Sequence, residues 1–156
     1  MTPAIDVARE AGIKHHIHHY QHDPASVGYG TEAAQKLGLN PGCVFKTLMV
    51  AVDTKTLVVA IIPVSAMLSM KLIAKAASGK KATMADKQRV QRSSGYVLGG
   101  VSPLGQKRPL TTFIDESAQL FEWIHVSAGR RGLEIELAPE DLATLTQGRF
   151  VALSQE

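Results

Sequence analysis

Apolar residues recur along the chain with two kinds of spacing, which predict helices mixed with strands and no internal repeat. The expected helices span residues 2–11, 30–38, 65–78, 86–93 and 139–146. The expected strands span residues 13–20, 44–52, 56–63, 109–114, 122–127, 132–137 and 149–153. The order of these segments is irregular, and several strands follow one another across short polar turns. This pattern predicts an α+β fold with a mixed, mostly antiparallel, barrel-like sheet and flanking helices.

One lysine interrupts an apolar strand. In "CVFKTLMV", residues 43–50, alternation places Lys46 on the same face as Val44 and Leu48, while Phe45 and Thr47 point the other way. A lysine is rarely buried without a partner, because removing an ammonium from water costs several kcal/mol, roughly. Lys46 is therefore either a functional residue in a pocket or a strand residue that extends its ammonium to solvent.

Two glycine-containing segments are candidate binding loops. "GYVLGGVSPLGQKRP", residues 95–109, has too little periodicity for a helix or strand, and glycine allows a backbone to approach a ligand closely. It contains neither G-x-G-x-x-G nor a P-loop, so it supports neither dinucleotide binding nor a P-loop NTPase. The turn "SAGRRG" places Arg130 and Arg131 between two strands, where they could hold phosphates or simply form a solvated hairpin tip.

Composition is typical of one globular domain covering residues 1–156, with 45% hydrophobic and 20% charged residues. Lys and Arg outnumber Asp and Glu by 17 to 14, a mild excess that suits an anionic partner without requiring one. The single cysteine, Cys43, excludes an intrachain disulfide and a multi-cysteine zinc site. No signal peptide or membrane-spanning stretch is evident, so we expect a cytoplasmic protein without membrane contact.

Four segments together carry a resemblance to a known family. They are "MTPAIDVAREAGI", "FKTLMV", "GYVLGGVSPLGQK" and "VSAGRRGLEIELAPEDL". In this order and spacing, over essentially the whole chain, they resemble the YbaK family of Cys-tRNA(Pro) deacylases, which is related to the editing domain of bacterial prolyl-tRNA synthetase. The resemblance implies a freestanding trans-editing enzyme that removes cysteine mischarged onto tRNA(Pro), with a small pocket in a mixed sheet.

The same resemblance implies roles for individual residues. Lys46 corresponds to the essential lysine of the family, placed where it can meet the aminoacyl ester or the terminal ribose and phosphate of the tRNA. A charge aimed at developing negative charge is worth more in a water-poor site than in bulk water. The implied substrate-binding residues are Tyr20, Phe45, Thr47, Gly99, Gly100 and Ser127. Arg130 and Arg131 match the basic turn and are implied tRNA contacts.

The sequence offers no convincing nucleophile of its own. Ser127 has His125 on the same strand face, but no acid to orient the imidazole is evident, and Cys43 is expected to begin a packed strand. In the family the substrate supplies the nucleophile: the cysteinyl thiol attacks its own ester carbonyl, and the enzyme contributes position and electrostatics. The thiolactone so formed is strained, so direct attack by water stays open. The enzyme would be of lyase or hydrolase type.

A histidine-rich segment, "KHHIHHYQH" at residues 14–22, departs from the family pattern. Alternation places His16, His18 and Tyr20 on one face of the expected strand. Alternate histidines can bind zinc, but neither face supplies a definite third ligand, and the family needs no metal. We therefore expect no metal and no cofactor.

The expected partners are tRNA(Pro), its mischarged cysteinyl form and prolyl-tRNA synthetase, and we expect no DNA binding. Two other functions fit the same residues. One is a noncatalytic adaptor that binds tRNA or a synthetase. The other is a deacylase with a different preference, such as alanine or another small amino acid, because specificity depends on pocket shape.

Overall fold

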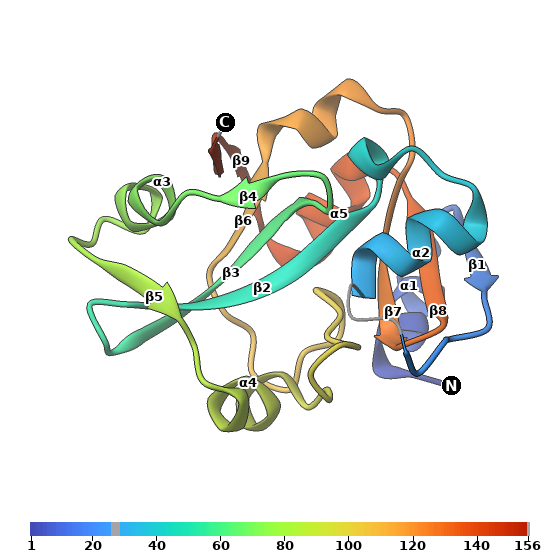
Figure 1. Cartoon of the computed structure of the whole chain (residues 1–156), viewed down its shortest axis with the longest axis horizontal. Helices are drawn as coiled ribbons and strands as arrows, with labels where there is room; N and C mark the ends of the chain where they lie inside the picture. Colours follow the sequence, from blue (N-terminus) through green and yellow to red (C-terminus); the bar gives the residue numbers. More distant parts are fainter. Residues whose placement is uncertain (26–28, 156) are drawn as a thin grey trace.

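The computed structural model describes residues 1–25 and 29–155, which form an α+β architecture of helices around three sheets (Figure 1). The α-helices are α1 (Pro3–Ala11), α2 (Tyr29–Leu37), α3 (Met70–Ala76), α4 (Lys87–Ser94) and α5 (Pro139–Thr146). Short 3-10 helices are η1 (Pro41–Cys43) and η2 (Glu116–Leu120). The expected α+β class is confirmed, whereas the sheets are open and do not close into a barrel.

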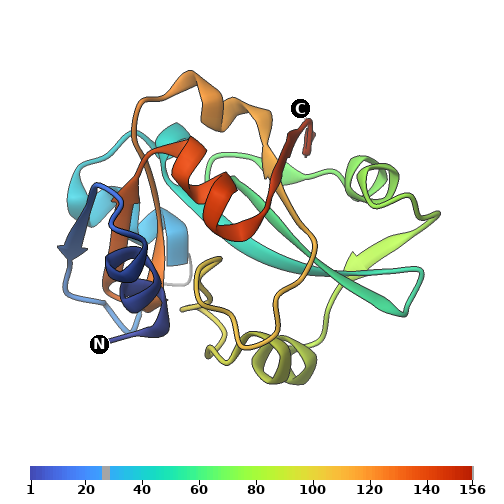
Figure 2. The same ribbon diagram turned by 180° about the vertical axis from the view of Figure 1, so that it is seen from behind.

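A three-stranded antiparallel sheet forms one half of the molecule. Its strands, in the order β1-β8-β7, are β1 (His15–His19), β8 (Leu133–Leu137) and β7 (Ile124–Arg130). Helix α2 lies over one face of this sheet, and α1 lies over the other (Figures 1 and 2). Helix α1 packs on β7. Helix α2 covers the opposite face of the sheet, so polar side chains on that face are partly removed from solvent.

A five-stranded mixed sheet forms the other half. Its order is β5 (Ala82–Met84), β2 (Phe45–Val52), β3 (Thr56–Pro63), β6 (Thr112–Asp115) and β9 (Arg149–Val151). The β2–β3 pair is an antiparallel hairpin, whereas β6 is parallel to both of its neighbours. A small two-stranded sheet pairs β4 (Met67–Leu68) with β10 (Ser154–Gln155).

Strand β2 passes between separate hydrophobic clusters. Phe45 and Met49 belong to a cluster that also contains residues of the three-stranded sheet, whereas Val50 and Val52 belong to a cluster with α3 and β6. This alternation is the one expected from the sequence. Because Phe45 packs in the cluster shared with the three-stranded sheet, the first residues of β2, around Lys46, lie where the two halves of the molecule meet.

Most expected elements are present, although the bounds of several differ. The predicted helix 65–78 begins only at Met70, because Ser69 caps it by accepting a hydrogen bond from the Leu72 N–H, and residues 67–68 pair with β10 instead. The predicted strand 109–114 begins at Thr112, and residues 95–111 contain no helix or strand. The long expected loop is thus confirmed and slightly extended.

Among the described residues, no helix is long and apolar enough to cross a membrane.

Candidate functional site

A cavity of about 360 Å³ opens between the two halves of the molecule, a size suited to a small organic group. Strand β2, the start of α2, the loop after α4 and the β7–β8 hairpin each contribute to its wall. The lining residues are Tyr20, Gly30, Thr31, Phe45, Lys46, Thr47, Leu48, Val64, Leu98, Gly99, Val101, Ser127, Arg130, Arg131 and Glu134. Except for Gly100, every site residue expected from the sequence lines this cavity.

Lys46 is half-buried in the wall of the cavity. It pairs across the hairpin with Ile62, and burial lowers the pKa of its ammonium. It forms no ion pair with any residue that the structure describes. A cation kept in a partly apolar wall without a protein counter-charge is suited to meet a negatively polarised atom of a ligand.

Glu134 is a cavity residue that sequence analysis did not predict. It lies on β8 with 6% of its surface exposed, and it forms no ion pair within the described part of the chain. Burial raises the pKa of its carboxyl to about 8, so the protonated form prevails at neutral pH. The cavity therefore holds an unpaired ammonium and a neutral carboxyl on different walls.

We expect the Glu134→Gln variant to be more stable than the wild type at pH 8 and about equally stable at pH 4.5. The folded-state pKa lies above the ordinary value of 4.5, so between pH 4.5 and 8 the native state must hold a proton that the unfolded chain releases. Thermal unfolding followed by circular dichroism over this range measures the effect. The exposed Glu122→Gln is the control. A difference in melting temperature that does not grow with pH would show that the native carboxyl is ionised.

Hydroxyl groups supply further polar positions in the cavity. The Thr47 hydroxyl is buried and has no hydrogen-bond partner among the described residues. The Ser127 hydroxyl accepts a hydrogen bond from the Gly129 N–H at 3.1 Å, which fixes it beside the irregularity in the β7–β8 pairing. The Tyr20 phenol, at the end of β1, has its pKa raised mainly by burial. These groups can orient an ester or a ribose by hydrogen bonds.

The glycine loop reaches the cavity through Gly99 and rests on the hairpin through Gly100. Gly99 has a φ of 94°, a conformation that L side chains rarely adopt. A Cβ on Gly100 would lie 2.7 Å from the Arg130 Cα, so a larger residue there would push the loop off the hairpin. Gly100 is buried and does not line the cavity.

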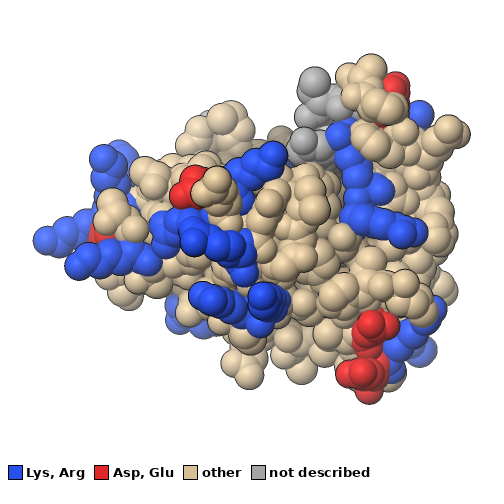
Figure 3. Space-filling model, turned by 90° about the horizontal axis from the view of Figure 1, so that it is seen from below, with Lys and Arg blue, Asp and Glu red and all other residues tan. Residues whose placement is uncertain are grey.

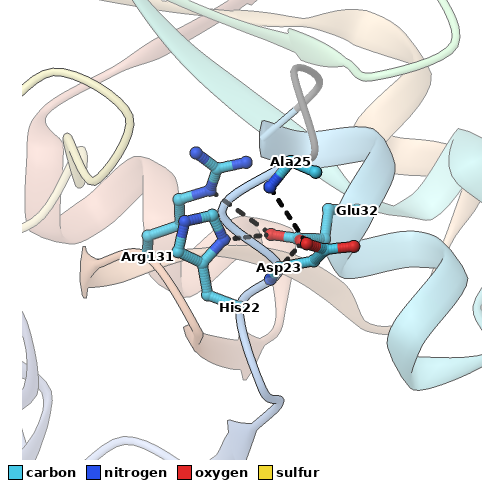
Figure 4. A network of polar contacts seen from close by, with 5 residues as sticks. All are labelled: His22, Asp23, Ala25, Glu32 and Arg131. Atoms are coloured by element: carbon cyan, nitrogen blue, oxygen red, sulfur yellow. Dashed lines mark hydrogen bonds and ion pairs between the residues drawn. The ribbon is translucent and has the colours of Figure 1, made fainter.

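The two arginines of the turn have different surroundings. Arg130 is exposed, whereas Arg131 donates from Nε to Glu32 Oε1 at 3.3 Å. The same carboxylate binds His22 Nδ1 at 2.8 Å and accepts a bond from the Asp23 N–H at 2.8 Å (Figure 4). Burial alone raises the pKa of Glu32, but these bonds and the Arg131 charge outweigh it, and the pKa is lowered. Arg131 thus helps to fix α2 to the hairpin.

Comparison with known proteins identifies the family. A family model for the aminoacyl-tRNA editing domain matches residues 26–145. The chain belongs to the aminoacyl-tRNA editing domain family. The match includes β2, the glycine loop and the β7–β8 hairpin, which supply most of the cavity wall.

Two curated relatives and two solved structures resemble this editing domain. The Enterococcus faecalis protein named "Putative Cys-tRNA(Pro)/Cys-tRNA(Cys) deacylase EbsC" is 41% identical over 121 residues, 78% of this chain and 74% of its own. The Bacillus subtilis protein named "Uncharacterized protein YwhH" is 32% identical over 65 residues, 42% of this chain and 41% of its own.

The solved structures show the same fold. A "putative trans-editing enzyme for prolyl tRNA synthetase" matches with a TM-score of 0.81 and 21% identity, covering 100% of this chain and 99% of the other. The "hypothetical protein APE2540" matches with a TM-score of 0.87 and 20% identity, covering 98% and 99%. The resemblance found in the sequence is thereby confirmed at the level of family and fold.

The editing domain contains an acid beside His125 that sequence analysis did not find. Glu136 Oε2 lies 3.7 Å from His125 Nε2, and Glu136 Oε1 lies 2.9 Å from His18 Nε2. Within the described residues, His125 and Ser127 form no hydrogen bond, so the parts of a catalytic triad are not assembled. Ser127 therefore lacks a base in this structure.

The same three side chains are also the candidate metal ligands. The ligand atoms of His18, His125 and Glu136 lie within 4.8 Å of one another, and no other such group is found in the part of the chain that is described. Strand β1 supplies one ligand, His18, and the other two come from β7 and β8 of the same sheet. Because Glu136 already interacts with both imidazoles, and the group lies outside the cavity lining, a metal is not needed to explain the arrangement.

Cys43 of the editing domain does not line the cavity. Its thiol donates a hydrogen bond to the Asn40 carbonyl at 3.2 Å, and burial raises the pKa of the thiol. A raised pKa leaves less thiolate at neutral pH, so Cys43 is a poor nucleophile.

Proposed function

We propose that this editing domain is a trans-editing deacylase that removes cysteine mischarged onto tRNA(Pro), acting as one domain over residues 1–156 in the cytoplasm. The observation that carries the proposal is the cavity of about 360 Å³ with the unpaired Lys46 ammonium in its wall. Membership of the editing family and the similarity to a relative named as a Cys-tRNA deacylase support the substrate class. An adaptor without catalysis would have no need to keep an unpaired cation partly buried.

The proposed chemistry uses the substrate's own thiol. The cysteinyl sulfur bonds to the ester carbonyl carbon, the carbon–oxygen bond to the tRNA breaks, and the thiol proton ends on the released ribose hydroxyl. The products are a thiolactone, later hydrolysed, and uncharged tRNA. Attack by water is the alternative route and gives free cysteine directly. In either route the protein supplies position and charge, because no described side chain of the cavity is an activated nucleophile.

Each polar group of the cavity has a proposed task in this scheme. Lys46 stabilises the negative charge that develops on the carbonyl oxygen. Glu134 faces the amino group of the aminoacyl moiety, whose positive charge can restore the ionised carboxylate that burial disfavours. The Thr47 and Ser127 hydroxyls, Tyr20 and the backbone at Gly99 orient the ester and the terminal ribose, and Gly100 holds the loop that carries Gly99.

A panel of aminoacyl-tRNAs tests the proposal. We expect rapid deacylation of Cys-tRNA(Pro) and no measurable loss of Ala-tRNA(Pro), which has no side-chain nucleophile, or of Pro-tRNA(Pro); release of labelled amino acid measures each rate. Comparing the rates for Cys-tRNA(Cys) and Cys-tRNA(Pro) measures whether the protein distinguishes one tRNA from the other. We propose that prolyl-tRNA synthetase supplies tRNA identity, so adding it should raise the preference for tRNA(Pro). Hydrolysis of none of these substrates would favour the adaptor, and a preference for alanine would change the assigned specificity.

A further inference from the structure

A second hollow lies next to α4, outside the candidate active site. Its wall combines the turn between β2 and β3, one face of α4 and the segment that precedes β6. The lining residues are Lys55, Leu57, Arg89, Arg92, Ser93, Arg108 and Leu110. Figure 3 looks at the side of the molecule on which α4 lies and shows Lys and Arg side chains gathered there, with few Asp or Glu among them. We call this hollow the α4 groove.

The positive charges of the α4 groove are not neutralised by the protein. Lys55, Arg89, Arg92 and Arg108 form no ion pair with any residue that the structure describes, and no acidic residue lines the groove. The acidic residues closest along the chain are Asp53, whose carboxylate accepts hydrogen bonds from the Lys80 and Lys81 N–H groups, and Asp86, which accepts one from the Arg89 N–H as the cap of α4. Like charges gathered around one hollow repel one another, and an anion bound there would relieve this repulsion.

The groove is also held in a fixed shape. The Arg89 guanidinium donates to the Thr54 and Lys55 carbonyls at 3.4 and 3.2 Å, which ties α4 to the β2–β3 turn. The Arg108 N–H donates to the Ser93 carbonyl at 2.9 Å, which places Arg108 beside α4. These bonds use backbone carbonyls, so they bring basic side chains together without supplying any negative side chain.

A buried hydroxyl in the groove wall is a second indication of a polar ligand, independent of the charges. Ser93 has 5% of its surface exposed, and its Oγ has no hydrogen-bond partner among the described residues. Its neighbour Ser94 is buried as well, but the Ser94 hydroxyl donates to the Val90 carbonyl. A buried hydroxyl without a partner costs free energy, and a phosphate oxygen in the groove is a partner that a small side-chain adjustment would supply.

The groove and the cavity are joined by a short piece of chain. Ser93 lines the groove and Leu98 lines the cavity, and five residues span at most about 18 Å. We propose that the α4 groove binds the phosphodiester backbone of tRNA next to the aminoacylated end, while the terminal aminoacyl group enters the cavity. This inference rests on the proposed function, and it places the main RNA contact on α4 rather than on Arg131, whose Nε is bonded to Glu32.

The test is the binding of uncharged tRNA to the Arg92→Gln/Arg108→Gln variant, measured by fluorescence anisotropy over a series of salt concentrations. Each phosphate contact contributes about 0.7 to 0.9 to the slope of log affinity against log salt. We expect the variant to lose about tenfold in affinity at low salt and about 1.4 to 1.8 in slope. Arg9→Gln/Lys14→Gln is the matched control, because it removes the same charge from exposed positions on and beside α1. Thermal unfolding verifies that both variants are folded.

A small substrate separates this inference from the proposed function. Cysteinyl adenosine carries the ester but no RNA backbone, so its deacylation is expected to be equal in the wild type and the groove variant. Unchanged tRNA affinity and slope in the groove variant, or equal losses in both variants, would overturn the groove assignment even if deacylation is normal. A wild type that binds tRNA through the groove but deacylates neither substrate would instead overturn the proposed function and leave the groove in place.

Discussion

Replacing Lys46 by alanine is expected to lower the rate of Cys-tRNA(Pro) deacylation by about two to three orders of magnitude, because a positioned charge at a developing oxyanion is worth about 2.7 to 4 kcal/mol. The fold should survive, since Lys46 forms no ion pair among the described residues and burying its ammonium opposes folding. Single-turnover deacylation with saturating enzyme measures the loss in the chemical step, and anisotropy measures tRNA binding.

Lys71→Ala is the control for this experiment, because Lys71 is exposed on α3 and lies outside the cavity lining. It should leave the rate unchanged. Near-normal deacylation by the Lys46→Ala variant would show that Lys46 only extends its ammonium to solvent, as an ordinary strand lysine does.

Changing the substrate from Cys-tRNA(Pro) to Ser-tRNA(Pro) is expected to nearly abolish turnover while binding is retained. The two amino acids differ by sulfur and oxygen, and the hydroxyl is a far weaker nucleophile than the thiol near neutral pH. If water were the nucleophile, both esters would be cleaved at similar rates, because the cavity would position them alike. Single-turnover rates for the two substrates decide between the routes.

The protein's own thiol serves as the control for that comparison. The Cys43→Ala variant should cleave Cys-tRNA(Pro) normally, because Cys43 lies outside the cavity lining and burial raises the pKa of its thiol. Rapid cleavage of Ser-tRNA(Pro) would refute the substrate-assisted scheme, and loss of activity in a folded Cys43→Ala variant would show that the protein thiol takes part.

The elements that the sequence predicted well are those whose own side chains determine them. The β2–β3 hairpin and α5 have the expected bounds within a residue, because long apolar runs and a proline at the helix start act locally. The strands β4, β5 and β10 were not predicted. They are two or three residues long, and their extended shape depends on partners elsewhere in the chain, which periodicity cannot reveal.

The same distinction applies to the site: residues marked by their own strand pattern could be predicted, and residues buried by elements elsewhere in the chain could not. The charge of Lys46 inside an apolar strand is anomalous by itself, and the family resemblance then assigned Lys46 to the pocket. Glu134 was not predicted, because "LEIEL" alternates in the way that a strand with one solvated face does. Alternation assigns Glu134 and Glu136 to one face but does not say what covers it. In the structure α2 and the start of β2 lie over that face, and Glu134 becomes buried.

The pairing of β1 with β8 has a consequence for aggregation. All five residues of β1 are in register with β8, and β8 has β7 on its other side. A chain that began at α2 would leave the backbone N–H and C=O groups of β8 unpaired along one edge, beside the apolar side chains of Leu133, Ile135 and Leu137. Such an edge is a template for strands of other molecules. Strand β1 is itself the outer strand of this sheet, so the histidine-rich segment replaces an apolar edge by one that carries mostly polar side chains, a poorer template for strands of other molecules.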